Sequence, residues 1–169
     1  MPDNTSIYRA FKQTLDSYTP ISDTTWYALK AVTQIKRLEK NQVLYQAGDI
    51  PATFVWVFHS LIRGFVCDEK GNEYNKKFFG EGMFPGTMLT NRPSKQGFDA
   101  LEETLVIEID FLAYRRLLLE YNDLKLFQIY YLEKNWLLDK DEREIAIVQL
   151  DASVRYQQFL SKSPRLWNA

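Results

Sequence analysis

The spacing of apolar residues at the start of the chain is that of two amphipathic helices. In the segment SIYRAFKQTLDSY the apolar residues recur every four positions and would share one helical face: Ile7, Phe11 and Leu15. Pro20 ends this segment, and Ser22 or Asp23 can cap a second helix. The second helix would carry its own apolar face, made of Trp26, Leu29 and Val32. Two helices are therefore expected between residue 1 and about residue 33.

From about residue 35 to residue 110 the pattern is that of short strands. TFVWVFHS reads as a buried strand, and LIRGFVCDEKGNEYNKKFFG reads as a hairpin whose turn lies at Asp68 to Asn72, with a glycine where positive φ is needed. In ALEETLVIEID the residues Leu105, Ile107 and Ile109 alternate with more polar neighbours. Short strands separated by turns every ten residues or so predict a sandwich or jelly roll.

After residue 110 the helical period returns. FLAYRRLLLEY is one short helix, and residues 122–150 form a long one without proline or glycine. Apolar residues recur there every seven positions with two flanking residues, and we take these as a dimer interface: Leu124, Phe127, Tyr131, Leu138, Ile145 and Val148. The alternative is packing of this helix on its own barrel; a helix of about 45 Å outruns a small domain, which favours the dimer. A last helix opens at Asp151.

The segment GEGMFPGTMLTNRPSKQG, residues 80–97, contains four of the seven glycines of the chain. Glycine permits tight turns and close backbone approach, so the segment could be an ordinary connection stiffened by Pro85 and Pro93. It could also be a nest of backbone N–H groups that binds an anion. The pattern alone leaves both readings open.

Composition excludes several classes of function. The chain has 169 residues, of which 46% are hydrophobic, and a formal net charge of -1, so it lacks the basic excess of a nucleic-acid binder. One cysteine, Cys67, and the absence of a leader or membrane span predict a cytoplasmic protein. One histidine, His59, argues against an imidazole metal site or a cupin-type enzyme, and there is no nucleophile elbow or P-loop. We expect no enzyme activity and no metal.

Several segments resemble the Crp/Fnr superfamily of cyclic nucleotide-type regulators, in the family's order. They are LYQAGD, VFHSLIRGFVCDEKGNEYNKKFF, GMFPG and LDASVRYQQFL. The resemblance implies a mainly β fold with flanking helices: a cyclic nucleotide-binding-type double-stranded β-helix (jelly roll) with N-terminal helices and a long C-terminal dimerisation helix. It also implies a sensor domain at 1–120, the dimerisation helix at 121–150, and the start of a winged helix-turn-helix region at 151–169.

The chain departs from the cyclic AMP-binding members at the two anchoring positions of the loop. Where the family's glutamate would hold the ribose stands Thr87, and the arginine and serine positions fall at Ser94 and Lys95. Lysine does not reproduce the fork of arginine, so cyclic AMP is not the expected ligand. The segment RPSKQGFDALEE resembles instead a divergent branch of the superfamily common in Bacteroidetes-like genomes.

If the loop still binds an effector, we expect a small anionic or nucleotide-like molecule and no fixed cofactor. The candidate ligand-binding residues are Gly82, Phe84, Gly86, Thr87, Met88, Arg92, Ser94, Lys95, Gln96, Lys140 and Asp141. The last two align with positions through which the family's long helix touches the nucleotide base.

The resemblance implies the effector-sensing and dimerisation domain of a transcriptional regulator, acting as a homodimer. DNA would be contacted only through a C-terminal domain of which this chain has just the first helix, and no membrane is involved. The alternative is a stand-alone cyclic nucleotide-binding-like module that regulates a partner protein without binding DNA.

Overall fold

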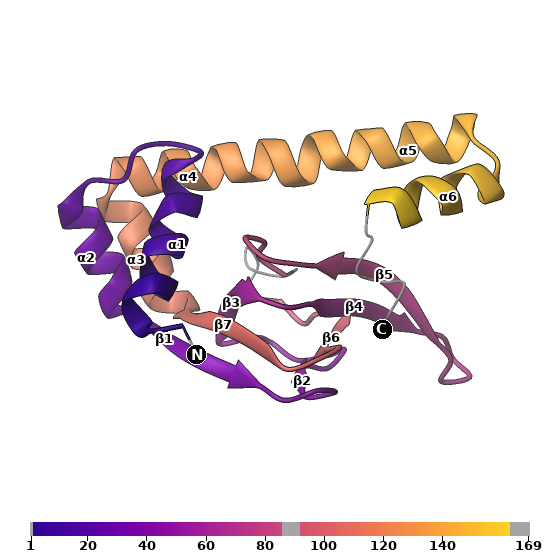
Figure 1. The fold of residues 1–169 in the computed structure, drawn as a ribbon, viewed down its shortest axis with the longest axis horizontal. Helices are drawn as coiled ribbons and strands as arrows, with labels where there is room; N and C mark the ends of the chain where they lie inside the picture. The colour runs from indigo at the N-terminus through magenta and orange to yellow at the C-terminus, as the bar shows by residue number, and fades with distance from the viewer. Residues whose placement is uncertain (1, 86–91, 163–169) are drawn as a thin grey trace. The chain divides into compact units, whose positions relative to one another are not determined.

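The computed structural model of the protein describes residues 2–85 and 92–162 (Figure 1). The chain divides at Lys125 into two compact units, the first ending there and the second beginning at Leu126. The first unit holds three helices and both sheets, whereas the second holds most of the C-terminal helices.

The N-terminal helices form as their sequence pattern predicts. Helix α1 (Asn4–Asp16) begins after Asp3, whose side chain accepts a hydrogen bond from the N–H of Ser6. Its buried residues are those of the four-residue spacing: Ile7, Phe11 and Leu15. Helix α2 (Asp23–Ala31) is capped by Ser22, which accepts from the N–H of Thr25. The expected stop, cap and apolar face of α1 and α2 are confirmed, although Val32 lies just past the end of α2.

In the described part of the chain, seven strands form two antiparallel sheets. The first sheet has the order β1-β7-β3, and the second the order β2-β6-β4-β5. The strands are β1 (Thr33–Leu38), β2 (Val43–Tyr45), β3 (Thr53–His59), β4 (Ile62–Cys67), β5 (Glu73–Phe79), β6 (Gly97–Ala100) and β7 (Thr104–Asp110). The hairpin between β4 and β5 turns where expected, with Gly71 at φ +83°. Strand neighbours that are distant in sequence, such as β1 with β7, are typical of the predicted jelly roll.

The β1-β7-β3 sheet is buried on both faces. On one face Leu38, Val55, Val57 and Val106 join a core with residues of the second sheet: Ile62, Phe79, Phe98 and Ala100. On the other face Trp56 meets Phe11 of α1, with ring centroids 5.1 Å apart, and Phe54 meets Tyr114 at 5.0 Å. The helices α1, α2 and α3 accordingly gather beside this sheet in Figure 1.

Because both faces of this sheet are covered, the alternation of apolar and polar residues along β7 does not leave one face exposed to solvent. Val106, Ile107, Glu108 and Ile109 are all buried. Glu108 is thus a carboxylate inside the roll, a position that the alternating pattern did not reveal.

The long C-terminal helix that the sequence predicts is present as a continuous helical run over residues 122–149, but it contains a π-helical segment. Helix α3 (Phe111–Glu120) is the expected short one. It is followed by α4 (Asn122–Leu132), a π-helical segment (Glu133–Leu138) and α5 (Asp139–Gln149), which run on without a break. Helix α6 (Ala152–Lys162) follows, and the Arg155 guanidinium donates to the carbonyl of Leu150 at 2.6 Å, which joins α6 to the end of α5. The π-helical turns were not predicted.

Candidate functional site

The first half of the glycine-rich loop is hydrogen-bonded along strand β3. The N–H of Gly82 donates to the carbonyl of Val57 at 2.8 Å, and the N–H of Val57 donates to the carbonyl of Met83 at 3.0 Å. Gly82 has φ +79°, a left-handed conformation that glycine adopts without strain. This half of the loop is therefore part of the sheet's framework.

Phe84 follows directly and belongs to the core between α1 and β3. Its side chain is buried, and its ring centroid lies 6.3 Å from those of Phe11 and Phe54. The next three candidate residues, Gly86, Thr87 and Met88, lie outside the described residues.

The second half of the loop is organised around Ser94. Its hydroxyl donates to the carbonyl of Gln96 at 2.8 Å and accepts from the N–H of Gln96 at 3.1 Å. Its backbone is joined to the turn between β2 and β3: the N–H of Ser94 donates to the carbonyl of Asp49, and the N–H of Gly48 donates to the carbonyl of Ser94. Ser94 is 4% exposed, so both its side chain and its backbone are engaged in the loop's own structure.

The cationic residues of the loop point to solvent. Arg92 and Lys95 are exposed, whereas Gln96 is half-buried. Two cations therefore flank a serine that is already hydrogen-bonded, and any anion bound at this end would meet Arg92 or Lys95 first.

A groove of about 700 Å³ opens between α1 and the start of the loop. Its walls include Trp56 and His59 of β3 together with Glu81 and Gly82. The Nδ1 atom of His59 lies 3.0 Å from a carboxylate oxygen of Glu81, and both side chains are substantially exposed. The lone histidine therefore lies at a strand end and is paired by hydrogen bonding.

A second polar cluster, which sequence reasoning missed, surrounds Glu108. Its carboxylate accepts from the Gln34 amide at 2.5 Å and from the Lys36 ammonium at 2.8 Å, with Thr53 Oγ1 at 3.2 Å. Burial opposes ionisation of Glu108, but the hydrogen bonds from Lys36 and Gln34 outweigh it and hold the pKa of this carboxyl below its usual value. Glu108 and Lys36 line a cavity of about 340 Å³ together with Asp49, the residue whose carbonyl binds Ser94. This cavity and the glycine-rich loop thus share the turn between β2 and β3.

A third cluster holds the end of the loop in place. The guanidinium of Arg63 donates to both carboxylate oxygens of Asp99, at 2.9 and 2.5 Å, and also pairs with Glu73 at 2.9 Å. Its hydrogen bonds to Asp99 raise the pKa of Arg63 further above its already high value. The same guanidinium lies 4.4 Å from the ring centroid of Phe65, and that ring covers Gly97 so closely that a Cβ there would overlap it. Only the nonlocal pairing of β4 with β5 and β6 brings these residues together, so no local sequence signal identifies them.

The remaining candidate ligand residues belong to the second unit. Lys140 and Asp141 are exposed on α5, and the Lys140 ammonium lies 3.5 Å from a Glu144 oxygen. They are solvated charges of α5, whereas the loop residues belong to the first unit.

The six residues expected at a dimer interface fall into two groups. Leu124, Phe127 and Tyr131 are buried, with the last two rings 5.8 Å apart. Leu138, Ile145 and Val148 are exposed, at 59%, 54% and 86% respectively. The π-helical segment follows the first group, and Leu138 of the second group is its last residue.

The described residues form neither a metal-binding cluster nor a membrane-spanning helix. Residues 2–85 and 92–162 contain no group of three or more His, Cys, Asp or Glu side chains placed to hold a metal ion. Within the same ranges, no helix has both the length and the apolar character needed to cross a membrane.

Comparison with known proteins identifies the fold through solved structures. No family model and no curated protein sequence matches the chain. The sensor domain of the transcriptional regulator DNR from Pseudomonas aeruginosa is similar with a TM-score of 0.64 and 19% identity, over 80% of this chain and 94% of that one. A cyclic nucleotide-binding domain from Methylobacillus flagellatus is similar with a TM-score of 0.68 and 15% identity, over 85% and 83% of the two chains.

A longer regulator is matched over part of its length. The Thermus thermophilus Catabolite Activator Protein has a TM-score of 0.64 and 15% identity over 80% of this chain, which spans 62% of that protein. At such identities the similarity concerns the fold, and the helices, sheets and glycine-rich loop described above occur in the order that the sequence led us to expect. The chain therefore has the cyclic nucleotide-binding fold, as its resemblance to the Crp/Fnr superfamily predicted.

Proposed function

We propose that the chain is the effector-sensing and dimerisation part of a Crp/Fnr-like transcriptional regulator that does not respond to cyclic AMP. It would act by regulation and carry no catalytic activity. DNA would be contacted through a C-terminal domain that begins at α6. Support comes from the fold and from the regulators that share it, among them the DNR sensor domain and the Catabolite Activator Protein.

The observation that carries the ligand part of the proposal is the engagement of Ser94. This residue stands where the family's anchoring groups would be, yet its hydroxyl both donates to and accepts from Gln96. A hydroxyl that is 4% exposed and has two partners is poorly placed to receive a cyclic phosphate. Losing charge-assisted hydrogen bonds removes about 1.5–3 kcal/mol each, enough to weaken binding by one to two orders of magnitude per contact.

Titration calorimetry with cyclic AMP and cyclic GMP tests this. We expect no heat of binding at ligand concentrations up to about 100 µM, because neither the ribose nor the phosphate finds its charged partner. A dissociation constant in the micromolar range or below for either nucleotide would contradict the proposal.

A different anion could still be held by the loop's two exposed cations. We expect such a ligand to raise the melting temperature of the unmodified protein in a thermal-shift screen of nucleotides, phosphates and organic acids, and to do so less for Lys95→Ala. The matched control is Lys40→Ala, a loss of charge in a turn outside the loop. A hit that stabilises the unmodified protein and Lys95→Ala equally would place its binding site elsewhere.

The alternative function is a stand-alone module that regulates a partner protein through its exposed helices. The exposed apolar residues of α5 favour association with some surface, and a second copy of the chain is the occupant that the proposed function requires. Measuring the oligomeric state of the chain alone separates the two, as described below.

A further inference from the structure

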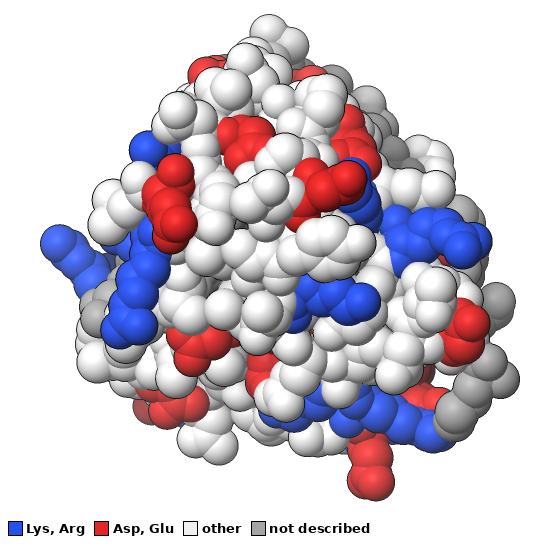
Figure 2. All heavy atoms as spheres, turned by 90° about the vertical axis from the view of Figure 1, so that its left-hand side faces the viewer, with Lys and Arg blue, Asp and Glu red and all other residues white. Residues whose placement is uncertain are grey.

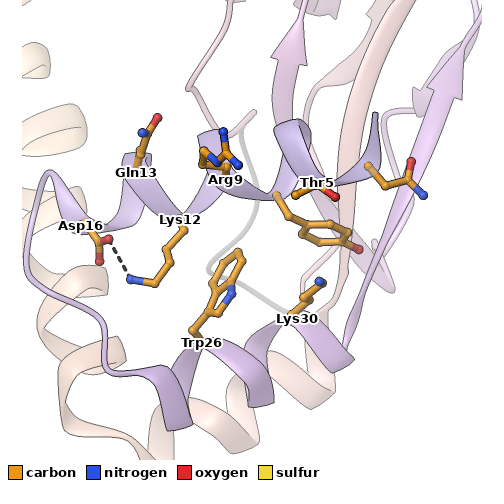
Figure 3. A pocket seen from close by; sticks show the side chains of 9 residues that line it. Thr5, Arg9, Lys12, Gln13, Asp16, Trp26 and Lys30 are labelled. Carbon is orange, nitrogen blue, oxygen red and sulfur yellow. Dashed lines mark hydrogen bonds and ion pairs between the residues drawn. The ribbon is translucent and has the colours of Figure 1, made fainter. Parts of the chain in front are cut away.

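A groove between α1 and α2 lies apart from the glycine-rich loop and has the features of a ligand site. Its volume is about 490 Å³, within the range of small-molecule sites. It is lined by Asn4, Thr5, Tyr8, Arg9, Lys12, Gln13, Asp16, Trp26 and Lys30. Figure 3 shows Lys12 extending from α1, and Trp26 and Lys30 extending from α2, into the space between the helices.

The apolar part of this groove is aromatic and held in place from behind. Trp26 is 9% exposed and packs on Phe11, with ring centroids 5.9 Å apart, so its orientation is set by the core. Tyr8 meets Trp26 edge to face at 6.3 Å. The planes of the two rings meet at 76°, so together they form an apolar corner into which the edge of a planar ring can pack.

The polar part of the groove is cationic. Three cations, Arg9, Lys12 and Lys30, and one carboxylate, Asp16, line the groove, which gives the lining a net charge of +2 on a chain whose total is -1. Lys12 is engaged, since its ammonium lies 2.9 Å from Asp16 and donates to the carbonyl of Ile21 at 3.2 Å. Lys30 lies 4.6 Å above the centre of the Tyr8 ring. Hydrogen bonds from Ser6 lower the pKa of Asp3, and the charge of Arg9 contributes to this lowering, so Asp3 also lies near Arg9.

This positive charge is local. On the face drawn in Figure 2, basic and acidic side chains are interspersed, and its described residues form no continuous area of one sign. A general attraction for polyanions is thus not expected there, whereas one small anion that reaches Arg9 and Lys30 would gain from both.

From these features we infer that the α1–α2 groove binds a small planar organic anion, an aromatic ring that carries a carboxylate or a phosphate. The ligand's ring packs into the corner formed by Trp26 and Tyr8, and its anionic group pairs with Arg9 and Lys30. Lys12, already paired with Asp16, fixes one end of the groove. This site is distinct from the effector site proposed at the glycine-rich loop, and either one can exist without the other.

Saturation-transfer NMR on the full chain tests the inference with two anions and their neutral counterparts. The anions are indole-3-carboxylate and adenosine 5′-monophosphate, and the neutral counterparts are indole-3-carboxamide and adenosine. We expect at least one anion to bind with a dissociation constant below about 1 mM, and its neutral counterpart to bind at least about tenfold more weakly. The carboxylate and phosphate arms show which anionic group the site prefers.

Two double variants with the same change of charge locate the binding. Arg9→Gln with Lys30→Gln removes the two exposed cations of the groove and should lower the affinity at least about tenfold. Lys40→Gln with Lys76→Gln removes two exposed cations elsewhere and should leave the affinity unchanged. Circular dichroism checks that each variant is folded.

Three results would overturn the inference. They are the absence of binding by both anions at about 5 mM, equal binding of an anion and its neutral counterpart, and equal loss of affinity in the two double variants.

Discussion

Three glycines of the segment 80–97 differ in what the structure requires of them. Gly82 needs a left-handed backbone, with φ +79°, while its N–H binds the carbonyl of Val57. Gly97 lies beneath the ring of Phe65, where a Cβ would not fit. Gly80 has neither constraint, since a Cβ there would make only an ordinary contact with Leu61 at 4.0 Å. Part of the glycine enrichment is thus explained by the roll itself, whether or not the loop binds an anion.

The environments of Gly82 and Gly80 predict different outcomes when each residue is replaced by alanine. Gly82→Ala should lower the free energy of unfolding by about 1–2 kcal/mol, because an L-residue is strained in the left-handed region. Gly80→Ala is the matched control and should be neutral or slightly stabilising, since alanine reduces the entropy of the unfolded chain. Urea denaturation measures both. Equal destabilisation by the two substitutions would show that loss of flexibility, and not φ, matters at this loop.

At Glu108 the pH dependence of stability follows from the direction of the pKa shift. The folded-state pKa lies below the usual value of 4.5, so the carboxylate stabilises the fold at neutral pH and loses this contribution as the pH falls through that lower folded-state value. Glu108→Gln should cost about 1–3 kcal/mol at pH 7, because the hydrogen-bonded ion pair of the buried Glu108 carboxylate with Lys36 is lost. The difference from the unmodified protein should shrink at about pH 3.

The control for that measurement is Glu69→Gln, a carboxylate to amide change at an exposed position of the β4–β5 hairpin. It should leave the urea midpoint unchanged at both pH values. A cost for Glu108→Gln that is the same at pH 7 and pH 3 would mean that packing, and not charge, is what the glutamate provides.

At the scale of elements, the start of α4 is joined to the start of α2 by one carboxylate. Asp123 accepts from the N–H of Ser22 at 2.9 Å and from the hydroxyl of Thr25 at 2.8 Å. Burial alone would raise the pKa of Asp123. The hydrogen bonds from Ser22 and Thr25 have the larger effect, so the pKa of this carboxyl lies below its usual value. Ser22, the residue that caps α2, is therefore also hydrogen-bonded to the start of α4.

Asp123→Asn should weaken this junction. An amide accepts less strongly than a carboxylate and brings a donor that Ser22 and Thr25 do not need, so we expect a loss of about 1 kcal/mol, the figure being small because the group is largely solvated. Thermal unfolding, compared with Glu102→Gln at an exposed turn, measures it. A melting temperature equal to that of the unmodified protein would show that packing alone sets the junction.

What the sequence could predict at this scale depended on local signals. The four-residue spacing of α1, the Ser22 cap and the glycine of the β4–β5 turn are each contained within a few residues, and all are confirmed. The partners of Glu108 are not local, because they depend on the register that sets Gln34 opposite Glu108. The π-helical segment also lacked a signal, since no proline or glycine marks it.

The same limits explain what was predicted of the candidate site. The loop's position between β5 and β6 followed from the pattern of turns and strands. The backbone hydrogen bonds of Ser94 did not, because they depend on a turn 45 residues away in sequence that includes Asp49. The Arg63 cluster and the α1–α2 groove likewise need residues that the fold alone brings together.

At the scale of the whole molecule, the exposed apolar residues of the second unit need a partner. Those on and next to α5 are Leu137, Leu138, Ile145, Ile147 and Val148, and those on α6 are Val154 and Tyr156. Exposed apolar residues gathered on two adjoining helices are a common mark of association. Each π-helical turn takes one residue more than an α-helical turn, so the seven-residue spacing does not continue as one stripe from Tyr131 to Leu138. The proposed dimer interface therefore rests on Leu138, Ile145 and Val148.

The proposed dimer can be tested by sedimentation. Sedimentation of the unmodified chain at about 50 µM should show a dimer, and Leu138→Glu or Ile145→Glu should shift it to monomers, because a charge buried in an apolar interface without a partner is costly. Gln149→Glu adds the same charge at an exposed polar position and should leave the dimer intact. If the unmodified chain were monomeric at that concentration, the exposed apolar surface would have to meet a different protein, as the alternative function requires. If Gln149→Glu dissociated the dimer as fully as Leu138→Glu did, charge repulsion and not apolar packing would govern the assembly.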